Sequence, residues 1–182
     1  MEQEMEAIEF LRKMGREVQS ERTAQGMYQI ELGERAGFTR LYISQIENTY
    51  RYKYHTNIYF KLAIALNIPL SVLVYRAMAQ DSQITLDTFE TEGYNYPLEF
   101  DDITKVINYY SKKLKDERIA RGIPRWKMAK QLNVVKETLE DTEHNYILTP
   151  FTRYYEYAKV FDFKLYDLIK EAEDFVINNK SK

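Results

Sequence analysis

The sequence predicts an all-α protein in which two tandem copies of one helical domain are joined by an aromatic-rich connector. Three observations lead to this fold class. Apolar residues recur at helical spacing, five short helical segments fit before residue 80, and the second half of the chain repeats the pattern of the first. We place the domains at residues 1–79 and 101–182, and the connector at residues 80–100.

The composition describes an ordinary globular protein and argues against several kinds of site. The 182 residues are 45% hydrophobic and 30% charged, and no apolar run approaches the length of a membrane span. The acidic start Met1–Glu6 is unlike a signal peptide, so we expect a cytoplasmic protein. Because there is no cysteine, and His55 and His144 are far apart, we expect no metal and no cofactor.

The net charge of −2 hides an uneven distribution. Between Phe10 and Tyr75 basic residues outnumber acidic ones, whereas acidic residues gather at the N-terminus and in residues 81–102. Attraction to phosphate is screened within about 10 Å at ordinary salt, so the local excess matters more than the total. The segment from Phe10 to Tyr75 therefore has the positive charge that a surface for binding nucleic acid needs.

The first domain begins with an amphipathic helix, predicted from about Ala7 to Gln25. Two short helical patterns follow, Gln29–Ala36 and Thr39–Asn48, with only Gly37 and Phe38 between them. So short a connection permits only a tight turn between crossing helices, which is the pattern of a helix-turn-helix. The turn requires a residue with positive φ, and Gly37 adopts it without steric cost.

A basic, tyrosine-rich loop at 49–57 leads to two further predicted helices, Ile58–Leu66 and about Leu70–Ala79. The helical period is then lost in the connector, whose aromatic residues suggest an ordered segment. A shift of 96 positions aligns the second domain with the first, and one deletion later restores the alignment. The aligned pairs include Arg22 with Arg118, Gly26 with Gly122, Glu47 with Glu143, Ala63 with Ala158 and Leu70 with Leu165.

On these residues the first domain resembles the lambda-repressor-like family of helix-turn-helix regulators, of the Cro/cI (XRE) type. The matching positions are Gly26, Gln29, Leu32, Gly37, Ile43, Ser44, Ile46, Glu47 and Leu66 to Ile68. The second domain resembles the family more weakly, with Asn133 in place of the turn glycine. The N-cap of the second helix departs from the family pattern, because Tyr28 and Pro124 stand where Ser or Thr is usual.

Two pairs of opposite charges recur at the same separation in both domains, Arg22 with Glu47 and Arg118 with Glu143. One interpretation is a buried ion pair that ties the first helix of each domain to the end of the third. The resemblance implies the same pair. The alternative is that all four are solvated surface charges.

The helix after the turn has one face suited to reading base edges. Four residues share that face, Arg40, Leu41, Ser44 and Gln45. Arg40 can recognise guanine, Gln45 can pair with adenine and Leu41 can contact a thymine methyl group. Ser44 can hydrogen-bond with either a donor or an acceptor on a base edge. The opposite face, with Ile43, Ile46, Glu47 and Tyr50, is predicted to be core. Phosphate contacts are expected from helix ends and the following loop, namely Gln29, Thr39, Asn48, Arg51, Lys53 and Tyr54.

The equivalent face of the second domain carries Lys136, Glu137, Glu140, Asp141 and His144. Three carboxylates should be repelled by the anionic groove of DNA, so we expect this copy not to read bases. Its basic flanks leave nonspecific backbone contact open. Dimerisation and a basic protein partner at this domain are equally open.

The leading hypothesis is a sequence-specific regulator, more readily a repressor, that binds double-stranded DNA. Because a single small module rarely has enough affinity, we expect a homodimer on a palindromic operator. The alternative is a protein-interaction module, an inhibitor, antitoxin or phage-type modulator, that uses the acidic second domain. A third arrangement is a single chain in which both copies bind DNA. No pattern of catalytic residues is present, so we expect no enzymatic activity.

Overall fold

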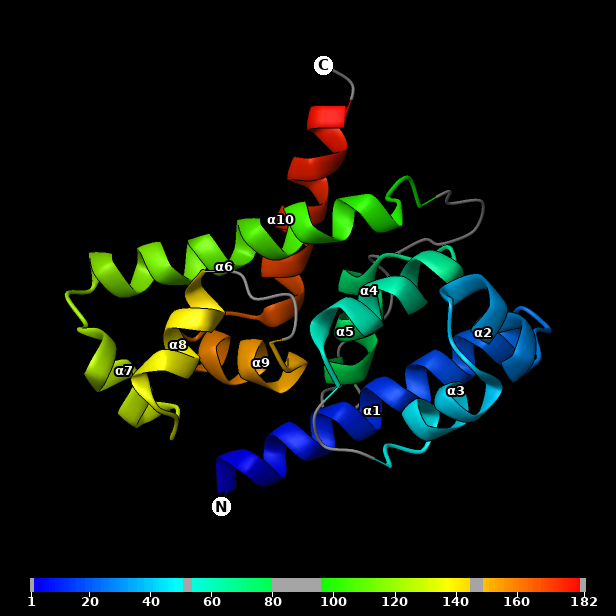
Figure 1. Cartoon of the computed structure of the whole chain (residues 1–182), viewed down its shortest axis with the longest axis horizontal. Coiled ribbons are helices and arrows are strands. Elements are labelled where there is room, and N and C mark those ends of the chain that lie inside the picture. Colours follow the sequence, from blue (N-terminus) through cyan, green and yellow to red (C-terminus); the bar gives the residue numbers. More distant parts are fainter. Residues whose placement is uncertain (1, 51–53, 80–95, 145–148, 181–182) are drawn as a thin grey trace.

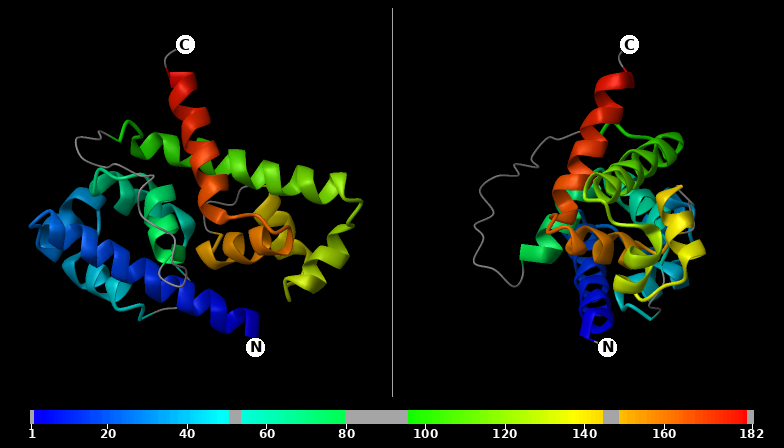
Figure 2. Two further views of the ribbon diagram at one scale, coloured as in Figure 1. Left: turned by 180° about the vertical axis from the view of Figure 1, so that it is seen from behind. Right: turned by 90° about the vertical axis from the view of Figure 1, so that its left-hand side faces the viewer.

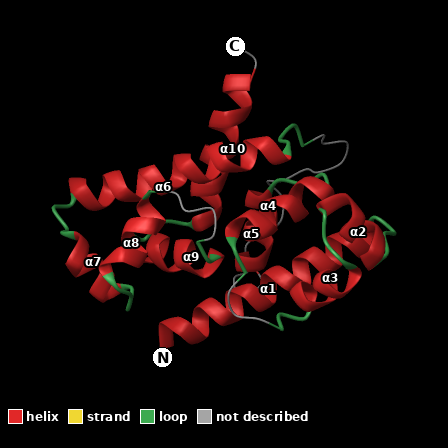
Figure 3. Cartoon of the chain, viewed as in Figure 1, coloured by secondary structure: helices red, strands yellow, loops and turns green. Residues whose placement is uncertain are grey.

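The computed structural model describes residues 2–50, 54–79, 96–144 and 149–180. Within these ranges the chain forms ten α-helices and one 3-10 helix and contains no strand, which confirms the all-α class (Figure 3). The elements are α1 (Glu2–Ala24), α2 (Gln29–Ala36), α3 (Arg40–Glu47), α4 (Thr56–Ala65), α5 (Leu70–Ala79), η1 (Phe100–Asp102), α6 (Ile103–Ala120), α7 (Arg125–Gln131), α8 (Lys136–Glu143), α9 (Phe151–Val160) and α10 (Leu165–Lys180).

The repeat seen in the sequence is present in the backbone. Helices α1 to α5 and α6 to α10 follow the same order, and α7, α8 and α9 begin at the positions that the alignment assigns to α2, α3 and α4. The turn between the second and third helices has positive φ in both halves, 74° at Gly37 and 51° at Asn133, as predicted. Each half therefore folds by the same local rules.

The crossing of α2 and α3 leaves no room for a side chain at Gly33. A Cβ built there would lie 2.6 Å from the carbonyl oxygen of Phe38. The backbone amide of Phe38 also donates a hydrogen bond to the carbonyl oxygen of Gly33 at 2.7 Å. A second close approach, which the sequence did not indicate, occurs at Gly15 on α1. A Cβ there would lie 2.6 Å from the carbonyl oxygen of Ile46, so α1 and the end of α3 also meet backbone to backbone.

The two halves are related by a pseudo-twofold axis. His55 and Pro150, which are counterparts in the repeat, pair in an antiparallel β-bridge. Two hydrogen bonds hold it, from the Thr56 amide to the Thr149 carbonyl (3.1 Å) and from the Phe151 amide to the Tyr54 carbonyl (2.9 Å). Exchanging the two copies converts each hydrogen bond into the other, which is the property of an isologous contact.

The helices obey the same symmetry. Helix α5 packs against its counterpart α10, and the contact of α1 with α9 is matched by the contact of α4 with α6. In Figure 1, α1 and α6 run in opposite directions along opposite edges of the molecule. In the right panel of Figure 2, α3 (cyan) and α8 (yellow) lie on the same side, and α5 (green) lies on the other.

One hydrophobic core runs through both halves, from Leu11 and Leu32 to Leu139 and Ile169. The predicted units 1–79 and 101–182 therefore share an apolar interior. Of the predicted connector, residues 80–95 lie outside the described residues. Its end is packed, since Tyr96 and Leu98 are buried.

Candidate nucleic-acid interface

The α3 outer face is the set of side chains that α3 turns away from the core, Arg40, Leu41, Ser44, Gln45 and Asn48. Thr39 begins the helix as its N-cap, and its hydroxyl accepts from the Tyr42 amide at 3.2 Å. Arg40 is exposed, Leu41 retains 69% of its accessible surface, and Ser44 and Gln45 are half-buried. The structure thus brings together the four residues predicted to read bases.

The opposite side of α3 is core, with one exception. Ile43 and Ile46 are fully buried and Glu47 is 4% exposed, as predicted. Tyr50 follows the end of the helix, and 79% of its surface is exposed, so its assignment to the core was wrong. The chain turns at Thr49, where φ is 50°, and this turn directs the next residue out of the helical pattern.

Of the residues predicted to hold phosphates, Tyr54 was assigned wrongly. It is 1% exposed, and its hydroxyl donates to the carbonyl of Gln45 at 2.7 Å, so it satisfies the end of α3 from the inside. The aromatic ring packs edge-on against Tyr42 and Tyr59. Arg51 and Lys53 lie outside the described residues.

Two other predicted phosphate ligands make internal contacts that the sequence analysis missed. The side-chain nitrogen Nε2 of Gln29 donates to Oε2 of Glu47 at 2.8 Å, so this side chain helps to orient the buried carboxylate. Asn48 is exposed, and its side-chain nitrogen Nδ2 donates to the carbonyl oxygen of Ser44 at 2.8 Å. Thr39 is exposed at the start of α3, as the prediction requires.

The predicted ion pair between Arg22 and Glu47 is present and buried. Nε of Arg22 donates to Oε1 at 2.6 Å and Nη2 donates to Oε2 at 3.1 Å, while the side chain of Glu47 is fully covered. Nη1 of the same guanidinium donates to the carbonyl of Met27 at 2.6 Å. The pair therefore fixes the end of α3 against α1 and the segment before α2.

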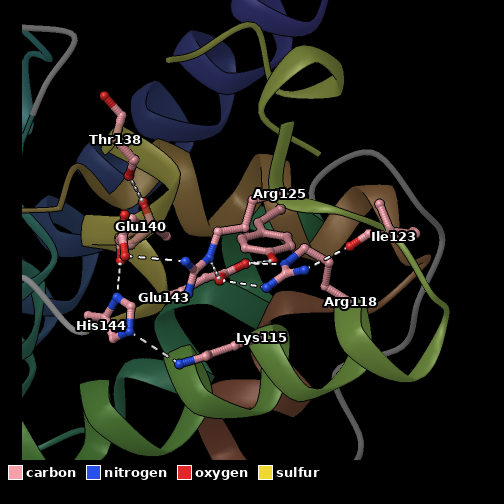
Figure 4. A network of polar contacts seen from close by, with 10 residues as sticks. Lys115, Arg118, Ile123, Arg125, Thr138, Glu140, Glu143 and His144 are labelled. Carbon is pink, nitrogen blue, oxygen red and sulfur yellow. Dashed lines mark hydrogen bonds and ion pairs between the residues drawn. The ribbon is translucent and has the colours of Figure 1, made fainter. Parts of the chain in front are cut away.

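The second half repeats this arrangement (Figure 4). Arg118 donates to the two carboxylate oxygens of Glu143 at 2.5 and 2.9 Å and to the Ile123 carbonyl at 2.7 Å. Arg125 takes the place of Gln29, and its Nε lies 3.3 Å from Glu143. The hydroxyl of Tyr157 adds a hydrogen bond to Glu143 at 2.7 Å.

The electrostatics of this network favour the charged forms. Burial opposes ionisation of Glu143, but hydrogen bonds from Arg118 and Tyr157 outweigh burial and hold its pKa below the ordinary value. The hydrogen bond to Glu143 raises the pKa of Arg118 despite burial. Both ion pairs thus serve as rigid supports behind α3 and α8.

The outer face of α8 is acidic, as the sequence predicts. Glu137 and Asp141 are exposed, whereas Glu140 is half-buried and paired with Arg125 at 3.2 Å. His144 contacts Nζ of Lys115 at 3.2 Å. The two outer faces therefore differ in charge, although their helices occupy equivalent places in the fold.

No protein-family model, curated protein or solved structure matches this chain. The resemblance to lambda-repressor-like regulators thus stays a prediction that rests on the residues quoted for it.

In the described part of the chain, no group of three or more His, Asp or Glu side chains could hold a metal ion. No single described helix is long and apolar enough to cross a membrane, and the pair α4 and α5, which together reach that composition, bend by 105° at their junction.

Proposed function

We propose that this protein is a sequence-specific, double-stranded DNA-binding transcriptional regulator, more readily a repressor than an activator. The observation that carries the proposal is the α3 outer face. It exposes Arg40 and Leu41 beside Ser44 and Gln45, on a helix whose other side is fixed by the buried Arg22–Glu47 pair. Rigid placement matters because bidentate recognition of a base requires a fixed distance and angle. On this proposal α2 and α3 form a helix-turn-helix, and the protein is not an enzyme.

The proposed reading helix is supported by its N-terminus. Arg40 is the first residue of α3, and the N-terminal residues of a recognition helix are those that reach base edges. Thr39, immediately before it, stands where a phosphate can accept from helix amides. Arg40 would grip guanine, Gln45 would pair with adenine, and Leu41 would contact a thymine methyl group.

The test is DNA selection from a random pool, followed by affinity measurements on the selected sequence. Arg40→Ala should weaken binding by about 1–3 kcal/mol and relax the preference at one base position. Lys136→Ala is the matched control, because Lys136 is the counterpart of Arg40 on α8 and should leave the preference unchanged. If both Arg40→Ala and Gln45→Ala leave affinity and preference intact, the regulator proposal fails.

The number of chains on DNA is a separate part of the proposal. A homodimer on a palindromic operator would place two α3 helices about 34 Å apart. The internal pseudo-twofold favours a different arrangement, in which one chain supplies both helix pairs and only α3 reads a half-site. The mass of the complex on selected DNA distinguishes two chains from one, and the selected sequence will be palindromic only in the first case.

A second candidate function is a protein-interaction module. The observation that favours it is the outer face of α8, where Glu137 and Asp141 are exposed. Two apolar side chains of the same half are also exposed, Val135 at the N-cap of α8 (63%) and Trp126 on α7 (64%). A basic protein that binds this face should lose affinity with the double change Glu137→Gln and Asp141→Asn, whereas DNA affinity should not fall.

A further inference from the structure

A buried carboxylate joins the two halves next to the pseudo-twofold axis. Glu173 lies on α10, is 2% exposed, and accepts three hydrogen bonds from distant parts of the chain. The donors are the Leu70 amide at 2.9 Å, the Ser71 hydroxyl at 2.5 Å and the Tyr96 hydroxyl at 2.6 Å. Glu173 therefore binds the N-terminus of α5 and the end of the connector at once.

The described groups that donate to Glu173 are polar and uncharged. Helix α5 supplies its first amides and Ser71, and the chain before η1 supplies Tyr96. Helix α6 carries the buried Tyr110, whose pKa is raised mainly by burial and, to a smaller extent, by the charge on Glu173. Among the described residues, an ionised Glu173 is thus stabilised by these hydrogen bonds and by the dipole of α5.

These donors do not fully offset burial of the charge. Burial raises the pKa of Glu173 to about 7, although Ser71, Tyr96 and the amides of α5 act in the opposite direction. The contact is also absent from the other side of the axis, because the counterpart of Glu173 in the repeat is Met78. The carboxylate is therefore a feature of this one crossing, and the shared fold does not require it.

We propose that Glu173 is a pH-sensitive latch between the two halves, which holds α10 on α5 tightly when it is protonated and less tightly when it is ionised. In the protonated form the group is neutral, and the hydroxyl of Ser71 or Tyr96 can rotate to accept a hydrogen bond from the carboxyl group. In the ionised form the buried charge has no ion pair with any of the described residues, and any opening that admits water to the crossing relieves it.

The direction of the pH effect follows from linkage. A folded pKa above the unfolded value means that the contribution to stability is complete below pH 4.5 and is lost as pH rises through about 7. Between pH 6 and pH 8 the equilibrium constant for undocking should rise by roughly tenfold, as this shift implies. The proposal does not depend on DNA binding.

The experiment is amide hydrogen exchange on the full chain at pH 6 and pH 8, corrected for the intrinsic pH dependence of exchange. We expect the opening constant of amides in α5 and α10 to rise about tenfold between these pH values, with a smaller change in α2. Glu173→Gln should remove that pH dependence, because the amide keeps two acceptor sites and cannot ionise. Glu171→Gln, on the same helix, is the matched control and should leave it in place.

A direct titration keeps the proposal testable if Glu173→Gln does not fold. The carboxyl carbon of Glu173 in the unaltered protein can be followed by NMR as pH is raised. A midpoint near 7 supports the latch. A midpoint near 4.5, or an opening constant of α5 and α10 that does not change between pH 6 and pH 8, overturns it.

Discussion

His55 and Pro150 are counterparts in the internal repeat, and they pair directly with each other across an antiparallel bridge. A residue that meets its own counterpart must lie on, or close to, the axis that relates the two copies. The chain is consequently built as two similar units around a pseudo-twofold axis, and the core passes through both. This relationship shapes the predictions that follow.

The shared core predicts that the two halves unfold together. The fluorescence of Trp126, the single tryptophan, reports on the second half of the chain, whereas far-ultraviolet circular dichroism reports on the helices of both halves. We expect the two signals to give coincident urea transitions with one midpoint. Two separated transitions would instead show that residues 1–79 and 101–182 are independent domains.

The buried ion pair predicts a large loss of stability when one partner is removed. Arg22→Ala would leave the fully covered carboxylate of Glu47 without its guanidinium, and we expect a loss of about 3–5 kcal/mol in the free energy of unfolding. Urea denaturation measures it. Arg12→Ala, which breaks a solvent-exposed pair with Glu9, should change stability by about 0.5 kcal/mol or less. Similar losses from both variants would contradict the burial of the Arg22 pair.

The close crossing of α2 and α3 predicts that Gly33→Ala and the reverse change at its counterpart Ala129 both destabilise the protein, for different reasons. Gly33→Ala gains helix propensity of about 1 kcal/mol, but its Cβ would lie 2.6 Å from the Phe38 carbonyl, so we expect a net destabilisation of about 1–2 kcal/mol. Ala129→Gly, at the counterpart position, should destabilise by about 1 kcal/mol through propensity alone. Thermal unfolding measures both losses of stability, and a Gly33→Ala variant more stable than the original protein would exclude the tight crossing.

The network around Glu143 predicts a change in acid stability. Because the pKa of Glu143 is lower in the folded protein than its ordinary value of 4.5, its ionised form stabilises the fold at pH values above 4.5. This contribution to stability is lost as the pH falls through the pKa of the folded state. Tyr157→Phe removes one donor to the carboxylate, so its pKa should rise and acid unfolding should begin at a higher pH. Circular dichroism during acid titration measures the midpoint. Tyr50→Phe, at an exposed ring, should leave the midpoint unchanged, and an equal midpoint in Tyr157→Phe would show that its hydroxyl does not stabilise the charge.

Several features could be read from the sequence because local rules or the repeat determine them. The helices follow from the spacing of apolar residues, and Gly37 and Asn133 mark the turn because few residues tolerate positive φ. The two ion pairs were predictable because a charge pair repeated at one separation in two copies indicates a constraint on the fold. The exposed α3 outer face followed from the same helical period.

The tertiary structure alone decided which polar side chains face inward and how the two halves meet. Tyr54 and Gln29 looked like phosphate ligands, yet they are bound to Gln45 and Glu47, because residues that surround α3 in space determine their partners. Nothing near Glu173 in sequence marks it as buried, since its partners Leu70 and Ser71 lie more than a hundred residues away. Local spacing determines which helices form and which way each one faces, but burial is a property of what packs on top, and here that is the other half of the same chain.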